Sequence, residues 1–223
     1  MRVYFVISEL QVQTYFLEFN KFYVCLSEQL WILDSNNTTG YFSSIDGSKQ
    51  ILTGMHQSAI EGNVEDTQFY LDHLQHEHTP LTRNKDDDDL VYSPVHYAAM
   101  NGRVEVLKLF QENLPDMSIV NKKGQNALHC AAQEGELEVV KFLANVIPTD
   151  SIDKDEFNSF HLAAKNGQVA VVQFLADMIP AEAVENCGRN ALHLASIEGE
   201  LPVVQLLADT VPTDTVDNRG FVA

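Results

Sequence analysis

The sequence predicts an all-α repeat protein in which one helical unit is copied five times along the chain. Five segments align on a histidine, and the last three intervals between these histidines are 33, 32 and 32 residues. Beyond each histidine, apolar residues recur at helical spacing, as in VEVLKLF (104–110) and LEVVKFL (137–143). A proline recurs near the end of four units, again 33, 32 and 32 residues apart. A fixed period of this length is typical of a solenoid.

The five aligned segments are HQSAIEG (56–62), HYAAMNG (96–102), HCAAQEG (129–135), HLAAKNG (161–167) and HLASIEG (193–199). With the residues before the histidine, as in SPVHYAA and NALHCAA, the unit resembles the ankyrin repeat and its T-P-L-H-x-A core. The resemblance covers residues 46–220 and implies an ankyrin-repeat solenoid of helix-turn-helix units with short β-turns. The repeats are expected at 46–78, 88–120, 121–152, 153–184 and 185–216, within a domain that spans 46–223. TGMHQSA marks a divergent first repeat.

The residue types within one unit indicate how its helices begin, pack and end. Paired small residues such as Ala131 and Ala132 allow the first helix to approach its neighbours closely, where larger side chains would overpack. A glycine such as Gly135 ends that helix in a conformation with positive φ. The recurrent proline, as at Pro148, predicts a second helix that is slightly longer than usual and stops there.

Residues 1–45 differ from the repeats because they hold ten of the chain's aromatic residues. Apolar positions between Ser8 and Leu30 follow a 3.6-residue period, which predicts a long amphipathic helix. We expect this N-terminal helical cap to cover the open face of the first repeat, since solenoid ends expose core surface unless they are capped.

Two further departures from the repeat lie at residues 79–91 and at the last repeat. The interval between His56 and His96 is longer than one unit, and the excess predicts an acidic loop insertion at 79–91 that includes Asp86 to Asp89. The segment DNRGFVA (217–223) reproduces the start of a further unit. No C-terminal cap follows from the sequence, so Leu192, Ile197, Leu201 and Val204 are expected to be incompletely covered, and end-to-end self-association through this repeat is an open alternative.

Charge and composition exclude several classes of protein. The chain has 14 basic and 32 acidic residues, a net charge of −18, which argues against nucleic-acid binding. The apolar run at the N-terminus is too short for membrane insertion. Three cysteines far apart do not form a disulfide framework, which favours a cytoplasmic location.

Histidines are the tempting candidates for catalysis, but the sequence favours a structural role. Side chains that recur at one position of every repeat are separated by a translation and do not converge on one substrate; the resemblance implies that they bond turn backbone. His73, His76 and His78 form a separate cluster, HLQHEH, that offers two or three metal ligands. An exposed polar helix end explains it equally well. We predict no catalytic residues, no resident metal and no cofactor, because no motif for them is present.

The resemblance implies that a partner binds the concave face, which is built from turn tips and first helices. The positions of this face in all repeats hold six basic and five acidic residues, a net charge of +1, whereas the rest of the chain carries −19. Aromatic and arginine side chains are typical binding anchors. We call the following candidate residues the binding face: Tyr92, Met100, Asn101, Lys122, Lys123, Gln125, Gln133, Glu134, Lys154, Asp155, Phe157, Lys165, Asn166 and Arg189.

These observations favour a non-enzymatic adaptor that binds a partner protein at a neutral or acidic site. For Tyr92 and Phe157 the alternative is packing between neighbouring turns. Two other functions remain open: the ankyrin targeting portion of a larger protein, such as a bacterial effector in the host cytoplasm, and a metal-assisted hydrolase that uses the HLQHEH segment.

Overall fold

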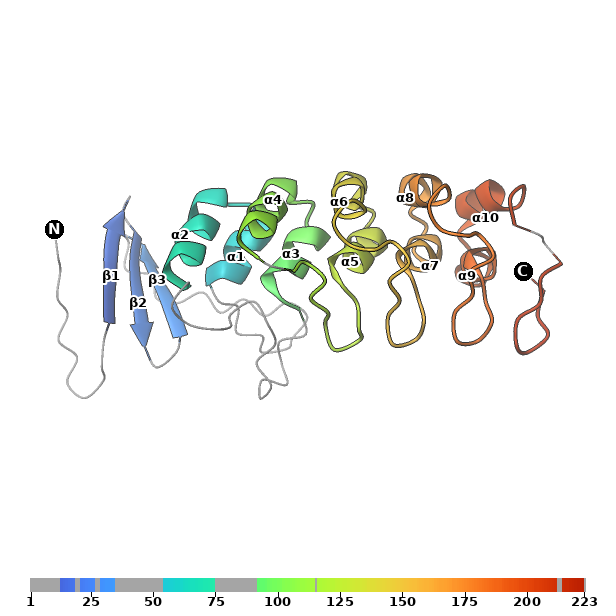
Figure 1. The fold of residues 1–223 in the computed structure, drawn as a ribbon, viewed down its shortest axis with the longest axis horizontal. Coiled ribbons are helices and arrows are strands. Elements are labelled where there is room, and N and C mark those ends of the chain that lie inside the picture. Colours follow the sequence, from blue (N-terminus) through green and yellow to red (C-terminus); the bar gives the residue numbers. More distant parts are fainter. Residues whose placement is uncertain are drawn as a thin grey trace.

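The computed structural model contains a small antiparallel sheet followed by ten helices that stack in pairs (Figure 1). It describes residues 13–18, 21–26, 29–34, 54–74, 92–114, 116–211 and 214–222. The strands are β1 (Gln13–Glu18), β2 (Lys21–Leu26) and β3 (Gln29–Asp34). The helices are α1 (Gly54–Glu61), α2 (Val64–Leu74), α3 (Pro94–Met100), α4 (Val104–Asn113), α5 (Ala127–Glu134), α6 (Leu137–Leu143), α7 (Ser159–Lys165), α8 (Val169–Leu175), α9 (Ala191–Glu198) and α10 (Leu201–Leu207).

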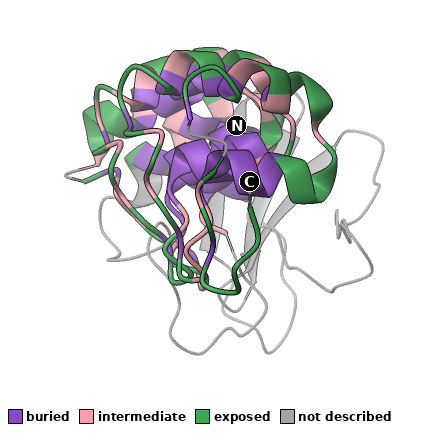
Figure 2. Ribbon diagram, turned by 90° about the vertical axis from the view of Figure 1, so that its right-hand side faces the viewer, coloured by how far each residue is buried: buried purple, intermediate pink, exposed green. Residues whose placement is uncertain are grey.

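The predicted ankyrin-type stack of helix pairs is confirmed. Odd-numbered helices contact one another in series and form an inner row, while even-numbered helices form an outer row, and the described turns that follow α4, α6 and α8 extend away from both rows (Figure 1). Viewed along the stack, buried residues lie in the interior, and exposed residues lie on the outer helices and the turns (Figure 2).

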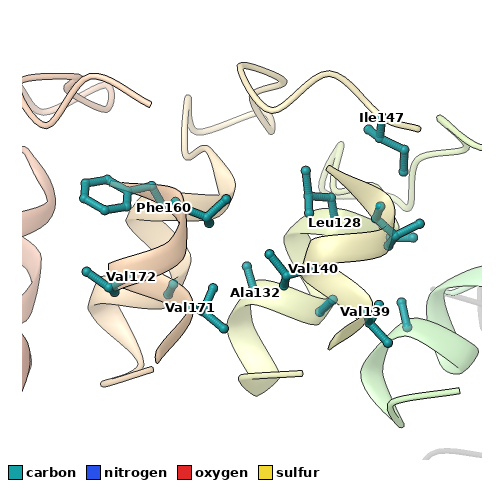
Figure 3. Close-up of a cluster of buried hydrophobic side chains, with 14 of the residues drawn as sticks. Leu128, Ala132, Val139, Val140, Ile147, Phe160, Val171 and Val172 are labelled. Atoms are coloured by element: carbon teal, nitrogen blue, oxygen red, sulfur yellow. The ribbon is translucent and has the colours of Figure 1, made fainter. Parts of the chain in front are cut away.

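One continuous core runs through all the described repeats. Ala131 and Ala132 are fully buried, which is why only small side chains fit between adjacent inner helices. Apolar residues of the outer helices, such as Val140, pack on the same core. Figure 3 shows the continuity from Leu128 and Ala132 of one repeat to Phe160 of the next. Neither helix pair buries its apolar face alone, so each repeat stabilises its neighbours.

Local sequence explains where the inner helices begin and end. The Asn126 side chain accepts a hydrogen bond from the His129 N–H, and the His129 ring accepts one from the Asn126 N–H, which together form a capping box at the start of α5. Gly135 ends the same helix at φ +85°, a left-handed conformation that glycine adopts at low cost.

The predicted extension of the outer helices to the recurrent prolines fits α4, which ends at Asn113, two residues before Pro115, but it is wrong for α6 and α8. Helix α6 ends at Leu143, and the tight hydrogen bond from Asn145 N–H to the Phe142 carbonyl replaces helical pairing before Pro148. Helix α8 ends at Leu175 in the same way relative to Pro180. A three-residue turn, rather than the proline, therefore stops these helices.

The predicted N-terminal helix is also wrong, because the described part of that segment is a three-stranded sheet in the order β1-β2-β3. Strand β2 pairs with β3 in a single register that sets Tyr23 opposite Ile32 and Val24 opposite Trp31. Aromatic and β-branched residues favour strands, and two residues separate each pair, as in tight hairpins. The helical period was a coincidence of closely spaced apolar residues. Strand β3 contacts α1, so the sheet lies at the α1 end of the stack (Figure 1); the capping role stays a prediction.

At the other end, the described residues 214–222 form the turn that would begin a further unit. Val216 and Val222 make an isolated antiparallel bridge, and Asn218 N–H donates to the Cys187 carbonyl of the preceding turn. Of the four apolar residues expected to be incompletely covered, Leu192 is buried and Val204 is half-buried, whereas Ile197 and Leu201 are each 61% exposed. The predicted insertion at 79–91 and its aspartates lie outside the described residues.

Candidate functional site

A buried polar residue braces each of the turns that the structure describes from inside. In the fourth repeat this residue is Asp153, whose Oδ1 accepts hydrogen bonds from the N–H groups of Asp155 (3.0 Å) and Phe157 (2.9 Å). The polar residues at this position recur 32 residues apart: Asn121, Asp153, Glu185 and Asp217. Each of them is less than 10% exposed, so the turns are held by internal hydrogen bonds instead of by solvent. This series was not predicted, although its 32-residue recurrence is visible in the sequence.

The periodic histidines link each inner helix to the next turn. His129 Nε2 donates to the Phe157 carbonyl (3.1 Å), and His161 Nε2 donates to the Ala183 carbonyl (2.8 Å). His96 and His193 repeat the arrangement on the carbonyls of Gln125 and Phe221. The predicted structural role of these histidines is confirmed.

Burial favours the neutral form of four of the buried histidines, His56, His96, His129 and His161. It lowers the pKa of His96 to about 4, against a smaller raising effect of the hydrogen bond to the Gln125 carbonyl. The pKa of His56 is also lowered to about 4 by burial, and burial lowers the pKa values of His129 and His161 as well. A neutral ring with its proton on Nε2 serves as both donor and acceptor, which is what the capping box and the link to the next turn require.

Adjacent turns are also joined directly at their tips by backbone hydrogen bonds. Lys154 N–H donates to the Lys123 carbonyl (2.9 Å), and Asn218 N–H donates to the Cys187 carbonyl (2.9 Å). Between them, Asn186 N–H lies 3.4 Å from the Asp155 carbonyl. The tips therefore form a bonded row, and side chains carried on the tips keep a constant spacing along the stack.

The structure brings thirteen of the fourteen predicted residues of the binding face to the surface of the turns and inner helices. Exposed positions are Lys123, Glu134, Lys154, Asp155 and Asn166. Half-buried positions are Tyr92, Met100, Asn101, Lys122, Gln133, Phe157, Lys165 and Arg189. Gln125 is only 5% exposed, because its amide donates to Asp153 Oδ2 (3.2 Å) and accepts from Asn121 Nδ2 (3.2 Å). The prediction that Gln125 is exposed on the binding face is wrong.

Phe157 and Lys165 form one aromatic and cationic unit on the binding face. The Phe157 ring packs edge-on against the His161 ring, with centroids 6.1 Å apart, so part of the side chain is used in packing. Lys165 Nζ lies 5.6 Å from the Phe157 centroid, and 3.9 Å from Glu198 Oε1. The half-buried ring therefore packs on the repeat and lies beneath the Lys165 ammonium group; its role as a partner anchor stays a prediction.

Tyr92 and Arg189 are tied into the repeats. The Tyr92 ring packs against the rings of His96 and Tyr97, with centroids 5.9 Å apart in both pairs. Burial raises the pKa of Tyr92. Arg189 Nε donates to Glu185 Oε1 at 2.8 Å. Burial acts to raise the pKa of Glu185, but the hydrogen bonds from Arg189 and its neighbours outweigh burial and lower it. Arg189 therefore braces its turn in addition to lining the face.

The same turns carry a row of exposed apolar side chains that was not predicted. Each lies one residue before the buried polar residue of its turn and is β-branched. We call this row the apolar stripe; its members are Val120 (51% exposed), Ile152 (55%), Val184 (52%) and Val216 (56%). Their spacing of 32 residues is a visible signal, but this position is not among those predicted to be exposed relative to the histidine.

Metal-ligating residues do not gather in the part of the chain that the structure describes: no group of three or more His, Cys, Asp or Glu side chains there is arranged to hold an ion. His76, His78 and Asp86 to Asp89 lie outside that part, and of His73 only the helical backbone is described. None of the described helices is long and apolar enough to cross a membrane.

Comparison with known proteins supports the repeat assignment. The family model for ankyrin repeats (3 copies) matches residues 55–155 and 145–218. An L-asparaginase of Dirofilaria immitis is 51% identical over 47 residues, which are 21% of this chain and 8% of that protein. A probable E3 ubiquitin-protein ligase XBOS32 of Oryza sativa subsp. japonica is 44% identical over 62 residues, 26% of this chain and 12% of its own length. The NAD-capped RNA hydrolase NUDT12 of Homo sapiens is 32% identical over 96 residues, 43% of this chain and 20% of its own length. The chain thus spans a fifth or less of these relatives.

Proposed function

Because the chain belongs to the ankyrin-repeat family, we propose that it is a non-enzymatic adaptor that holds a partner protein on its binding face. Ankyrin repeats are generally protein-binding modules. The observation that carries the proposal is the combination of exposed side chains with internally braced turns: Lys123, Lys154 and Asp155 are exposed on tips that bond to one another through their backbones.

Bracing favours binding because it removes part of the entropic cost of association. A free loop loses conformational freedom when it docks, whereas a turn already held by Asp153 and by the His129 link loses little. The cytoplasmic location predicted from the sparse cysteines is part of this proposal.

Charge on the binding face favours a partner site that is neutral or acidic. Lys122, Lys123 and Lys154 lie on two adjacent turns, in a chain whose net charge is −18. A cluster of cations on an otherwise acidic protein attracts an acidic site locally, so it orients an acidic partner on this face and disfavours a basic site there. Lys165 adds a cation that lies over the Phe157 ring.

Affinity capture with the whole chain, followed by mass spectrometry, would identify the partner. We expect the combined variant Phe157→Ala, Lys122→Glu and Lys154→Glu to lose capture while its circular-dichroism spectrum stays helical. The matched control is Lys108→Glu with Lys141→Glu, which makes the same change of charge on exposed residues of the outer helices. Capture that is unchanged in the first variant, or equally reduced in both, would contradict a role for the binding face.

The runner-up proposal is that the chain is the ankyrin targeting portion of a larger protein, such as a bacterial effector that acts in host cells. The observation in its favour is that the matched relatives carry the similar stretch within much longer chains. Coding sequence that continues beyond Ala223 in frame would support this proposal, and a stop codon at that point would overturn it.

A separate proposal concerns end-to-end self-association through α9 and α10. The Gln168 side chain covers Gly135 and the Glu200 side chain covers Gly167, whereas the space beside Gly199 is open. Leu201 and Phe221 are 61% and 66% exposed at the same end. Light scattering over a range of concentrations would show a rising mass that Leu201→Glu abolishes; a constant monomer mass would overturn the proposal.

A further inference from the structure

We propose that the apolar stripe is a docking track for an extended segment of the partner protein. This partner segment carries aliphatic side chains along one line, carboxylates on one edge and cations on the other. This inference rests on the proposed function, because the stripe lies on the same turns as the binding face. It goes further by naming the form and the chemistry of what the face binds.

Exposure and chemical uniformity together make the stripe unusual. Its four members are 51–56% exposed, yet every one is a valine or isoleucine. None of them belongs to the buried core or to the half-buried residues packed against it. The repeat fold therefore has no packing use for an apolar side chain here, and single exposed apolar residues would not recur at one position in four successive turns.

The turns hold the stripe in a fixed arrangement. Each member precedes a buried polar residue that accepts hydrogen bonds from its own turn, as Asp153 does after Ile152. The backbone bond from Lys154 to Lys123 joins the turns that carry Ile152 and Val120. A partner segment thus meets a line of side chains that is already in place, which lowers the cost of docking.

Charges on either side of the stripe indicate which residues flank the aliphatic ones in the partner. Two residues before three of the stripe members, the exposed carboxylates Asp150, Glu182 and Asp214 form an acidic row. On the opposite side, towards the tips, cations outnumber carboxylates. The charged tip residues are Lys122, Lys123, Lys154 and Arg219 against Asp155 and Glu156. A segment that lies along the stripe is complementary to both rows only if its two edges carry opposite charges.

Geometry sets the length of that segment. Packed helices lie about 8–10 Å apart, so three repeat steps from Val120 to Val216 span roughly 25–30 Å. A chain in the extended polyproline II conformation rises about 3.1 Å per residue with about three residues per turn, so every third side chain points to the same side and about ten residues reach from the first stripe member to the last. A single line of side chains fits one extended segment better than a broad globular surface.

A displayed library of random 12-residue peptides, selected on the whole chain, tests the inference directly. We expect enriched peptides to carry Val, Ile or Leu at about every third position together with both signs of charge. A synthetic copy of the strongest peptide, followed by fluorescence anisotropy, should bind at least tenfold more weakly to the variant V120T/I152T/V184T/V216T. Threonine keeps the β-branched shape and the preference for extended backbone, so only the apolar character is removed.

Three controls make each outcome decisive. Val64→Thr with Met178→Thr changes exposed apolar residues away from the stripe and should leave the affinity unchanged. Asp150→Lys with Glu182→Lys should weaken binding of the same peptide. The melting temperature of the quadruple threonine variant, measured by circular dichroism, should match that of the wild type.

Several results would overturn the inference: no enrichment, enriched peptides without the aliphatic spacing, or equal binding to the threonine variant. Its failure is separable from that of the proposed function. If the threonine variant captures the partner normally but the variant of Phe157, Lys122 and Lys154 does not, the binding face stands and the track fails. If both variants capture it normally, the proposed function fails as well.

Discussion

Two sets of residues recur every 32 positions in the C-terminal repeats, and the structure places them in opposite environments. His129 and His161 are each 1% exposed, and each bonds a backbone carbonyl of the following turn. Val120 and Ile152 are more than half exposed on turns of the same repeats. Both sets have the same period, so periodicity alone does not separate residues that hold the stack from residues that are available to a partner.

Burial makes the distinction, and it also changes the chemistry of each set. An imidazole out of water is neutral and costly to charge, so the histidines are structural links and poor candidates for acid-base chemistry. An aliphatic side chain in water gains free energy when a partner covers it. The five predictions below test this contrast, beginning with the largest effect.

Acid should destabilise the stack through its buried histidines. His56 and His96 have folded-state pKa values of about 4, against 6.5 in the unfolded chain. Between these values the unfolded chain binds protons that the folded protein does not, so the free energy of unfolding falls as the pH is lowered. From pH 7 to pH 5 we expect a loss of about 2 kcal/mol for each of the two, measured by urea unfolding.

The variant His96→Gln provides the control for this pH dependence. Glutamine retains an N–H donor and does not titrate, so the variant should show a shallower slope between pH 7 and pH 5. The measurement ends at pH 5 because Glu185 has a lowered pKa in the folded protein. Its carboxyl group adds a loss of stability of its own only as the pH falls below its unfolded pKa of 4.5. Equal slopes for the variant and the wild type would remove the histidine from the explanation.

Removing one histidine link should cost about 3 kcal/mol. In His129→Ala the Phe157 carbonyl loses its partner, the capping box of α5 is broken and a cavity remains. Glu134→Ala, at an exposed position of the same helix, should change stability by less than about 0.5 kcal/mol. A loss below about 1 kcal/mol for His129→Ala in urea unfolding would mean that the turn holds its place without this link.

Cutting the brace inside one turn should cost about 2 kcal/mol. Asp153→Ala leaves the N–H groups of Asp155 and Phe157 without their acceptor. Asp155→Ala removes an exposed carboxylate two residues away and serves as the matched control. Thermal unfolding should rank Asp153→Ala clearly below both the control and the wild type; similar melting temperatures for the two variants would argue that the turn is braced by its neighbours instead.

Relieving backbone strain at the tip of the fourth repeat should stabilise the protein by about 0.5–1 kcal/mol. Glu156 adopts φ +63°, whereas the equivalent residues Gly124, Gly188 and Gly220 are glycines with positive φ. Glu156→Gly removes the cost of that conformation for a residue with a Cβ. Glu112→Gly, within α4, should have the opposite sign. A melting temperature for Glu156→Gly at or below that of the wild type would count against the strain.

The smallest effect is expected at the apolar stripe. Ile152→Thr should change the free energy of unfolding by less than about 0.5 kcal/mol, because the side chain is 55% exposed. Ile147→Thr, five residues earlier, should cost about 2 kcal/mol, since that residue is 1% exposed in the core. If differential scanning calorimetry gave the two variants equal losses, the stripe would belong to the structural set and the contrast would disappear.

Much of the repeat architecture could be predicted from the sequence because it depends on local chemistry. Asn126 and His129 predict where a helix starts, and Gly135 predicts where it ends. These start and end signals recur at the same positions of successive repeats. The N-terminal segment could not be predicted in this way. Apolar residues at 15, 16, 22 and 23 satisfy a helical period and a pair of strands equally well, and pairing with another strand decides between them.

The candidate site was predictable only in part. Positions relative to the histidine located Lys123 and Lys154 on the surface, because a repeated backbone carries equivalent residues to equivalent places. Gln125 is an exception, since its amide donates a hydrogen bond to Asp153 of the following turn and is buried there. The apolar stripe was missed for the converse reason: a valine or isoleucine in a folding chain is expected in the core.

By itself the sequence determined the repeat unit, its period and its order along the chain, because capping residues, small residues and helical spacing act within a few residues of one another. Tertiary structure decided which periodic residues are covered. His129 is buried because the next repeat covers it. Val120 is exposed to solvent because its turn extends away from both rows of helices (Figure 1). Exposure depends on neighbours about 30 residues away, and no local pattern of residues records it.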